Sequence, residues 1–150
     1  GCSSLTSIEI PSSVTSIGDN AFNGCSLLDI VIFEEESQLK SIESYVFSGC
    51  SSLASVKFGT NSQLTSIGDR AFYGCSSLTS IEIPSSVTSI GYLAFYDCNS
   101  LTSVIFEDPN GWEVGYRGDR KDLSATDLSD PSTAARYLKD TYNGRYWEKS

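Results

Sequence analysis

Apolar and polar positions alternate in five equivalent segments of the chain, and each segment begins at a cysteine. The cysteines are Cys2, Cys25, Cys50, Cys75 and Cys98, at steps of 23, 25, 25 and 23 residues. Three, six and eight positions after each of them come a leucine, a branched aliphatic residue, and isoleucine or phenylalanine. The end of this pattern alternates as a half-buried strand does, which predicts strands near residues 8–10, 31–33, 56–58, 81–83 and 104–106.

A second apolar set follows in the four complete repeats. It comprises the pairs Val14/Ile17, Leu39/Ile42, Leu64/Ile67 and Val87/Ile90, and then Phe22, Phe47, Phe72 and Phe95. One repeat of this length cannot bury its own apolar face, but stacked repeats can, with like positions about 4.8 Å apart in ladders. Residues 1–18 and 74–91 are identical. Such identity suits a stack in which each copy meets equivalent neighbours.

The run C-x-x-L-x-x-I-x-I-P-x-x-V-x-x-I-G-x-x-A-F-x-G resembles the bacterial leucine-rich repeat of the BspA-like, treponemal type. Four full repeats and the start of a fifth match, over about residues 1–112. The resemblance implies an α/β-type, right-handed leucine-rich solenoid, with one parallel β-sheet and irregular or short extended segments opposite. It also implies a non-enzymatic adhesin or ligand-binding protein that is secreted or held on the cell surface.

The last part of the chain departs from the repeat. We expect the solenoid to occupy residues 1–114, with Trp112 filling the apolar ladder position a last time. A polar loop is expected over 115–129. Asp130 and Pro131 then provide an acidic N-cap and a proline in the first turn of a helix. The helix, with Tyr146 and Trp147 behind it, is interpreted as a cap over the last repeat within the same structural domain; a separate binding appendage is the alternative.

Composition narrows the range of functions. The net charge is −9, and residues 1–111 hold three basic and twelve acidic residues, which argues against nucleic-acid binding. Histidine is absent and no serine–histidine pair exists, so we expect neither catalysis nor a metal or other cofactor. No apolar run approaches the ~18 residues of a membrane span, so no membrane insertion is expected. The chain has no methionine and starts inside a repeat, which predicts further repeats and a secretion signal upstream.

The cysteines allow two readings. Five cysteines in a secreted protein suggest a disulfide framework. However, all five occupy one ladder position, where stacked side chains run parallel and their Cβ atoms lie too far apart for a disulfide. We therefore expect small, buried, reduced thiols.

Candidate binding residues occupy the outward strand positions, five and seven residues after each cysteine. Ile30, Ile32, Lys57 and Ile105 stand there among serines and glutamates, either as ligand contacts or as ordinary surface variation. Four tyrosines, Tyr45, Tyr73, Tyr92 and Tyr96, crowd the Ala-Phe turns.

A separate motif, Arg117-Gly118-Asp119, resembles the tripeptide by which matrix proteins engage integrins, and it also arises by chance. The expected partner is a protein or a glycan. The competing interpretation is a structural stalk whose recognition site lies elsewhere in a longer protein.

Overall fold

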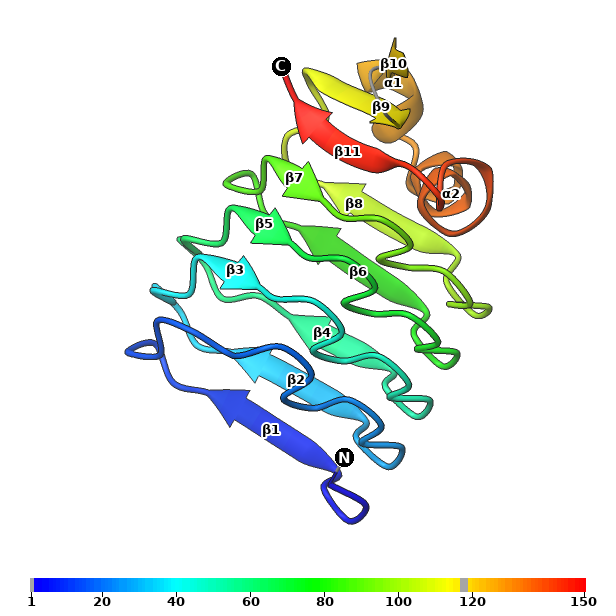
Figure 1. Ribbon diagram of the computed structural model, residues 1–150. Helices are drawn as coiled ribbons and strands as arrows, with labels where there is room; N and C mark the ends of the chain where they lie inside the picture. Colours follow the sequence, from blue (N-terminus) through cyan, green and yellow to red (C-terminus); the bar gives the residue numbers. More distant parts are fainter. Residues whose placement is uncertain (1, 117–118) are drawn as a thin grey trace.

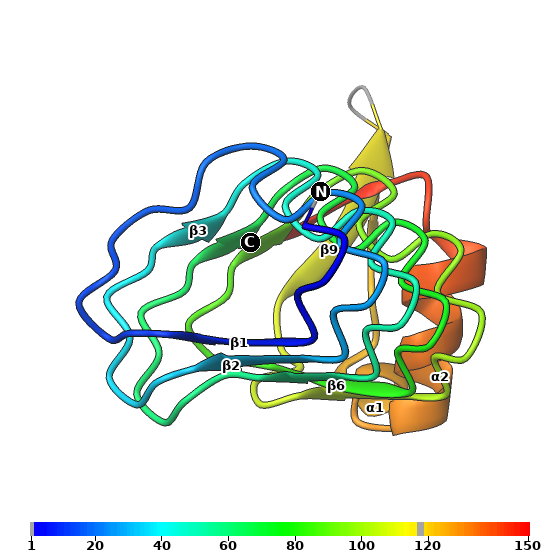
Figure 2. The ribbon, with the colours of Figure 1, turned by 90° about the horizontal axis from the view of Figure 1, so that it is seen from below.

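The computed structural model describes residues 2–116 and 119–150. The chain winds as a β-solenoid of about four turns, with a strand on each of two opposite sides of the coil (Figure 1). One side carries β1 (Ser7–Ile10), β2 (Ile30–Phe33), β4 (Ser55–Lys57), β6 (Ser80–Ile83) and β8 (Ser103–Phe106). The other side carries the short strands β3 (Ser41–Ile42), β5 (Ser66–Ile67) and β7 (Ser89–Ile90). Figure 2 shows these two sides as facing walls.

Strands of neighbouring repeats pair in parallel, and equivalent residues of the two repeats lie side by side. β1, β2 and β4 form one sheet section, in which Ile8 lies level with Val31 and Val31 with Val56. β6 and β8 form a second section on the same side, and β4 packs beside β6. The predicted parallel sheet and the short extended segments opposite it are confirmed.

The core lies between the two walls and consists of the predicted ladders. The repeat leucines Leu28, Leu53, Leu78 and Leu101 are fully buried, whereas Leu5, in the first repeat, is half-buried because it has a neighbour on one side only. Phenylalanine rings stack with centroids 5.4, 5.4 and 5.2 Å apart along the row Phe22, Phe47, Phe72 and Phe95. Phe58 lies outside β4 and is only half-buried, although its ring stacks on Phe33 at 5.1 Å.

The five cysteines are free thiols, and all but Cys2 are fully buried. The Sγ atoms of Cys50, Cys75 and Cys98 donate to the carbonyl oxygens of phenylalanines at 3.2, 3.2 and 3.1 Å. Burial raises the pKa of the Cys50 thiol to about 11 and that of Cys98 to about 12. These thiols therefore stay protonated and behave as small core residues.

A residue with a left-handed backbone conformation precedes each buried cysteine. It lies in the turn that leads toward the next strand. It is glycine at Gly24, Gly49 and Gly74, with φ near 70°. Asp97 takes this position in the last turn with φ 60°, so the backbone conformation persists where the glycine is lost. Aspartate tolerates this region better than most side chains do.

The C-terminal segment closes the coil with strands as well as helices. It contains β9 (Trp112–Tyr116), β10 (Asp119–Asp122), α1 (Ala125–Leu128), α2 (Pro131–Arg136), the π-helix η1 (Tyr137–Thr141) and β11 (Tyr146–Lys149). The expected helix start is confirmed, because the Asp130 side chain accepts from the Thr133 amide and Pro131 opens α2. α2 packs against β8, so the segment covers the end of the solenoid, as the cap interpretation predicts.

Three expectations for this segment are wrong, and two of them concern the extent of its elements. Residues 115–129 are not a polar loop, because β10 and α1 lie within them and Leu123 and Leu128 are buried. The Leu123 amide donates to the Trp112 carbonyl at 2.8 Å, which ties the stretch to β9. β9 also runs across the expected boundary between residues 114 and 115.

Trp112 is buried but does not extend the ladder of β3, β5 and β7 directly. β11 lies between β7 and β9 and is antiparallel to both. Trp147 of β11 therefore stands level with Ile90 on one side and with Val114 on the other. The reason is that β11 pairs with β7 along the edge that another repeat would otherwise occupy.

Candidate binding surfaces

The predicted strand residues lie on the outward face of the side that carries β1, β2, β4, β6 and β8, and three of the four lie together. Ile32 of β2 lies level with Glu9 on one side and Lys57 on the other, and Ile30 lies level with Ser55. Ile30 and Ile32 are half-buried and Lys57 is exposed. The sequence-based placement is thus correct for these three residues, and their role in binding stays a prediction.

Ile105 does not join that group. It lies on β8, 47% exposed, and is level with Glu82 of β6, so a whole repeat separates it from Lys57. Ile105 is farther still from Ile30 and Ile32, because β4 and β6 lie between β2 and β8 and each repeat adds one strand.

The tyrosines of the turns divide into two rows. Tyr73 and Tyr96 form one row, with ring centroids 5.6 Å apart. In the other row the Arg70 guanidinium lies over the rings of Tyr45 and Tyr92, at 5.5 and 5.4 Å from their centroids. Arg70 also donates to the Tyr45 hydroxyl at 2.8 Å. Charge–ring contacts of this kind are attractive and link the two rings through Arg70.

The second row continues into the C-terminal cap. Tyr92 has its ring centroid 6.3 Å from that of Tyr116 on β9 and 6.0 Å from that of Tyr146 on β11. Tyr116 and Tyr146 are 40% and 42% exposed. We call Tyr92, Tyr116 and Tyr146 the tyrosine cluster. The sequence analysis did not identify Tyr116 and Tyr146 as members of this cluster. The pairing of β11 with β7 brings them beside Tyr92, and no pattern in the neighbouring sequence indicates that pairing.

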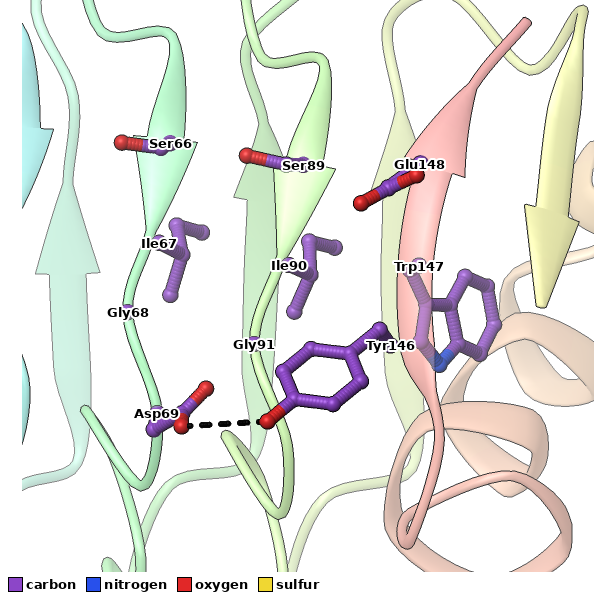
Figure 3. A pocket seen from close by; sticks show the side chains of 10 residues that line it. All are labelled: Ser66, Ile67, Gly68, Asp69, Ser89, Ile90, Gly91, Tyr146, Trp147 and Glu148. Carbon is purple, nitrogen blue, oxygen red and sulfur yellow. Dashed lines mark hydrogen bonds between the residues drawn. The ribbon is translucent and has the colours of Figure 1, made fainter. Parts of the chain in front are cut away.

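A shallow pocket of about 230 Å³ opens beside this cluster, across the outer side of β5, β7 and β11 (Figure 3). It is lined by Ser66, Ile67, Gly68, Asp69, Ser89, Ile90, Gly91, Tyr146, Trp147 and Glu148. Strand alternation explains the lining: Trp147 points into the core and is buried, while its neighbours Tyr146 and Glu148 turn outward. The pocket thus combines one exposed aromatic ring with carboxylates and hydroxyl groups.

The Tyr146 side chain extends to Asp69. Its hydroxyl donates to Asp69 Oδ2 at 3.5 Å, while Asp69 Oδ1 accepts from the Tyr92 amide at 2.9 Å. Figure 3 shows the ring reaching from β11 past Gly91 toward Asp69. Partial burial, and then the Asp69 carboxylate, raise the pKa of the Tyr146 hydroxyl. The hydroxyl is therefore a neutral donor over the physiological pH range.

The rim of the pocket is charged on the cap side. Arg120 donates to Glu113 at 3.3 Å and also pairs with Glu148. Hydrogen bonds from the Arg120 side chain to Glu148 and Glu113 raise the pKa of its guanidinium. Glu148 therefore enters the pocket wall with its orientation set by Arg120.

Only one residue of the predicted tripeptide can be placed. Arg117 and Gly118 lie outside the described residues. Asp119 begins β10, its side chain is 84% exposed, and its carboxylate forms an ion pair with Arg145 at 3.6 Å.

Within residues 2–116 and 119–150, no three histidine, cysteine, aspartate or glutamate side chains gather as a metal site would require. In the same residues, no helix has the length and apolar character needed to cross a membrane.

The stacked leucine ladder, the parallel strands and the short strands opposite define the class of leucine-rich repeat solenoids. Comparison with known families identifies the particular group: the chain belongs to the BspA type leucine rich repeat region family, which matches residues 1–112 in six copies. No curated protein sequence matched the chain.

Solved structures support the same assignment. A leucine-rich repeat protein from Bacteroides ovatus is 42% identical over 69% of this chain, with a TM-score of 0.61. The T. pallidum leucine-rich repeat protein is 30% identical over 67% of the chain, with a TM-score of 0.60. The pneumococcal vaccine antigen PcpA shares the fold, at 22% identity over 71% of the chain and a TM-score of 0.64. The matches cover 26%, 48% and 25% of those three chains, so this chain spans at most about half of each.

Proposed function

We propose that the chain is a non-enzymatic binding module of a secreted or surface-held bacterial protein, which attaches to a macromolecule of a host or of another microbe. The observation that carries the proposal is the tyrosine cluster with its pocket. Tyr116 and Tyr146 expose two-fifths of their surface beside a hollow of about 230 Å³. Tyrosine is enriched in contact surfaces because it combines a large apolar ring with a hydroxyl. Membership of the BspA type family supports the extracellular location.

The fold also supports recognition of a large partner. Stacked repeats create long, regular faces, and each repeat adds one strand about 4.8 Å further along the coil. On the open face of β2 and β4, the outward residues differ from repeat to repeat. Ile30 and Ile32 stand where β1 and β6 have serine and glutamate. A macromolecule that contacts several repeats therefore meets a distinctive patch there.

The test is a binding screen with an oligomerised form of the chain against matrix proteins, glycans and whole cells. Oligomerisation is needed because five strands span only about 20 Å, and one short face binds weakly. We expect saturable binding to at least one target. The double variant Ile32→Glu with Lys57→Glu measures the contribution of the open face and should weaken binding while leaving the melting temperature almost unchanged. Absence of binding to every target by correctly folded protein would contradict the proposal.

The second candidate function is a structural stalk, and one observation favours it. Residues 1–18 and 74–91 are identical, including the outward positions of β1 and β6. A selective face requires variation between repeats, whereas a spacer does not. A blank screen would therefore move the assignment to a stalk.

We also propose integrin engagement through Arg117-Gly118-Asp119 as a separate property of the same surface protein. The exposed Asp119 carboxylate supports it. Animal-cell attachment to immobilised protein should be lost in Asp119→Glu and retained in Asp122→Glu, a matched change at another exposed aspartate of β10. Equal attachment by both variants would rule integrin engagement out.

A further inference from the structure

We infer that the pocket beside Tyr146 is a subsite for one neutral sugar residue of a glycan. The inference rests on the proposed binding function and names the class of ligand that this site takes. It is argued from the shape of the pocket, the chemistry of its lining and the charges around it.

The aromatic ring provides an apolar wall against which a sugar ring can stack. A pyranose has one face made largely of C–H groups, and an exposed tyrosine offers a flat, polarisable partner for it. Tyr146 is suited to this role because its ring contacts that of Tyr92, with centroids 6.0 Å apart, and its hydroxyl lies 3.5 Å from Asp69 Oδ2, so both ends of the ring have a neighbour before a ligand arrives. A preset aromatic contact loses little conformational entropy on binding.

Close stacking of the repeats determines which residues can stand in the backbone that lines the pocket. Gly68 and Gly91 form part of the lining and have no side chain there. A Cβ on Gly91 would lie 2.5 Å from the Asp69 amide nitrogen, and one on Gly68 would lie 2.8 Å from the Glu43 carbonyl carbon. The backbone of the preceding repeat therefore restricts both positions to glycine, and this part of the pocket lining carries no side chain.

The polar part of the lining matches sugar hydroxyls. Asp69 and Glu148 offer carboxylate oxygens, which accept hydrogen bonds, and Ser66 and Ser89 offer hydroxyl groups, which donate and accept. A sugar brings several hydroxyl donors to such acceptors. The volume of about 230 Å³ suits one ring of a chain whose remainder extends over the neighbouring tyrosines Tyr92 and Tyr116.

The charges favour a neutral sugar over an acidic one and over a protein. Asp69 and Glu148 lie in the lining itself, and Arg120 is already bound to Glu148 and Glu113. A sialic acid or sulfated sugar would bring like charge to two carboxylates. The centre of a protein–protein interface is normally depleted of aspartate and glutamate, whereas here both stand beside the exposed ring.

The experiment measures binding of the oligomerised chain to an array of neutral oligosaccharides ending in glucose, galactose, mannose, fucose or N-acetylglucosamine, with sialylated and sulfated glycans on the same array. We expect binding to neutral members and at least a tenfold loss in Tyr146→Ala. Glu148→Gln should also weaken binding by several-fold. Tyr96→Ala is the matched control, because Tyr96 is similarly exposed at 36% but belongs to the other tyrosine row. Melting temperatures report whether each variant folds.

The outcomes separate the sugar subsite from the broader binding function. Binding to a glycoprotein that persists after enzymatic removal of its glycans would overturn the subsite and leave the binding function standing. Preference for sialylated or sulfated glycans would overturn it, as would an equal loss in Tyr96→Ala. Tyr146→Ala that folds and binds neutral glycans like the wild type would overturn it as well. Loss of all macromolecular binding in the screen would reject the function itself.

Discussion

Trp147 of the C-terminal strand stands level with Ile90, the last isoleucine of the short-strand ladder. Its ring stacks on Phe106 at 6.1 Å and meets Trp112 edge-on at 6.3 Å. One residue near the end of the chain therefore covers part of the core that an additional repeat would have covered. Because terminal repeats expose apolar surface unless they are capped, this contact bears directly on stability.

Trp147→Ala should lower the stability of the protein strongly. Removal of a buried tryptophan side chain costs about 3–5 kcal/mol, which corresponds to a fall in melting temperature on the order of 6–20 °C for a chain of this size. Thermal unfolding followed by circular dichroism measures it. Tyr146→Ala, the adjacent outward residue of β11, is the control and should cost about 1 kcal/mol. Equal losses in the two variants would show that β11 does not seal the core.

Glycines that occupy the same place in identical sequences should respond differently to substitution. A Cβ on Gly91 would lie 2.5 Å from atoms of Asp69, whereas a Cβ on Gly18 would meet nothing within 4 Å. Gly91→Ala should therefore cost about 1–3 kcal/mol, because backbone has to move. Gly18→Ala should change stability by less than about 1 kcal/mol in either direction. Urea unfolding of both variants provides the comparison, and similar destabilisation by both would refute the stacking argument.

The cysteines should be distinguished by exposure. In the native protein at pH 8, iodoacetamide should label Cys2 rapidly and the other four slowly, since those four are fully buried and burial raises the pKa values of Cys50, Cys75 and Cys98. Denaturation without reductant should release five reactive thiols per chain. Mass spectrometry counts the labels. A count of one after denaturation would mean two disulfides and an incorrect cysteine ladder.

The cap should loosen in acid through Asp108. Hydrogen bonds from Lys149 and Asn110 lower the pKa of the Asp108 carboxyl from 3.8 to about 2. A group with a lowered pKa in the folded state stabilises fully above its unfolded value and loses that contribution as the pH falls from about 4 through about 2. The effect is small, because exposed ion pairs are screened by solvent.

Asp108→Asn removes this titration. The melting temperature of the wild type should exceed that of the variant at pH 6, and the difference should shrink at pH 2. A difference that is the same at both pH values would show that the Asp108–Lys149 pair does not contribute to stability.

Much of the fold was predictable because the repeat is local and its physical requirements are simple. The spacing of Leu28, Leu53 and Leu78 identifies the buried positions, since stacking places like residues on top of one another. The outward placement of Ile32 and Lys57 follows from strand alternation in the same way. The helix start at Asp130 was also predictable, because an N-cap and the proline after it act on the first turn alone.

The binding pocket was not predictable, because its parts come from segments far apart in the chain. Asp69 and Tyr146 meet only through the pairing of β11 with β7. Alternation within β11 predicts that Tyr146 and Trp147 point to opposite faces, but it does not say which strand β11 joins. The same limit explains the error at Trp112, whose sequence position suited the ladder that β11 in fact continues.

The repeated sequence shows most clearly what the sequence determines and what the tertiary structure determines. By itself the sequence determined the ladders, the strand faces and the place of the cap, because these depend on the order of apolar and polar residues along the chain. The identical segments 1–18 and 74–91 have the same local preferences, yet Gly18 faces open space and Gly91 lies against Asp69. Only the tertiary structure decided that difference, since a residue's neighbours in a stack belong to other repeats and to the cap, and the free energy of packing depends on those neighbours.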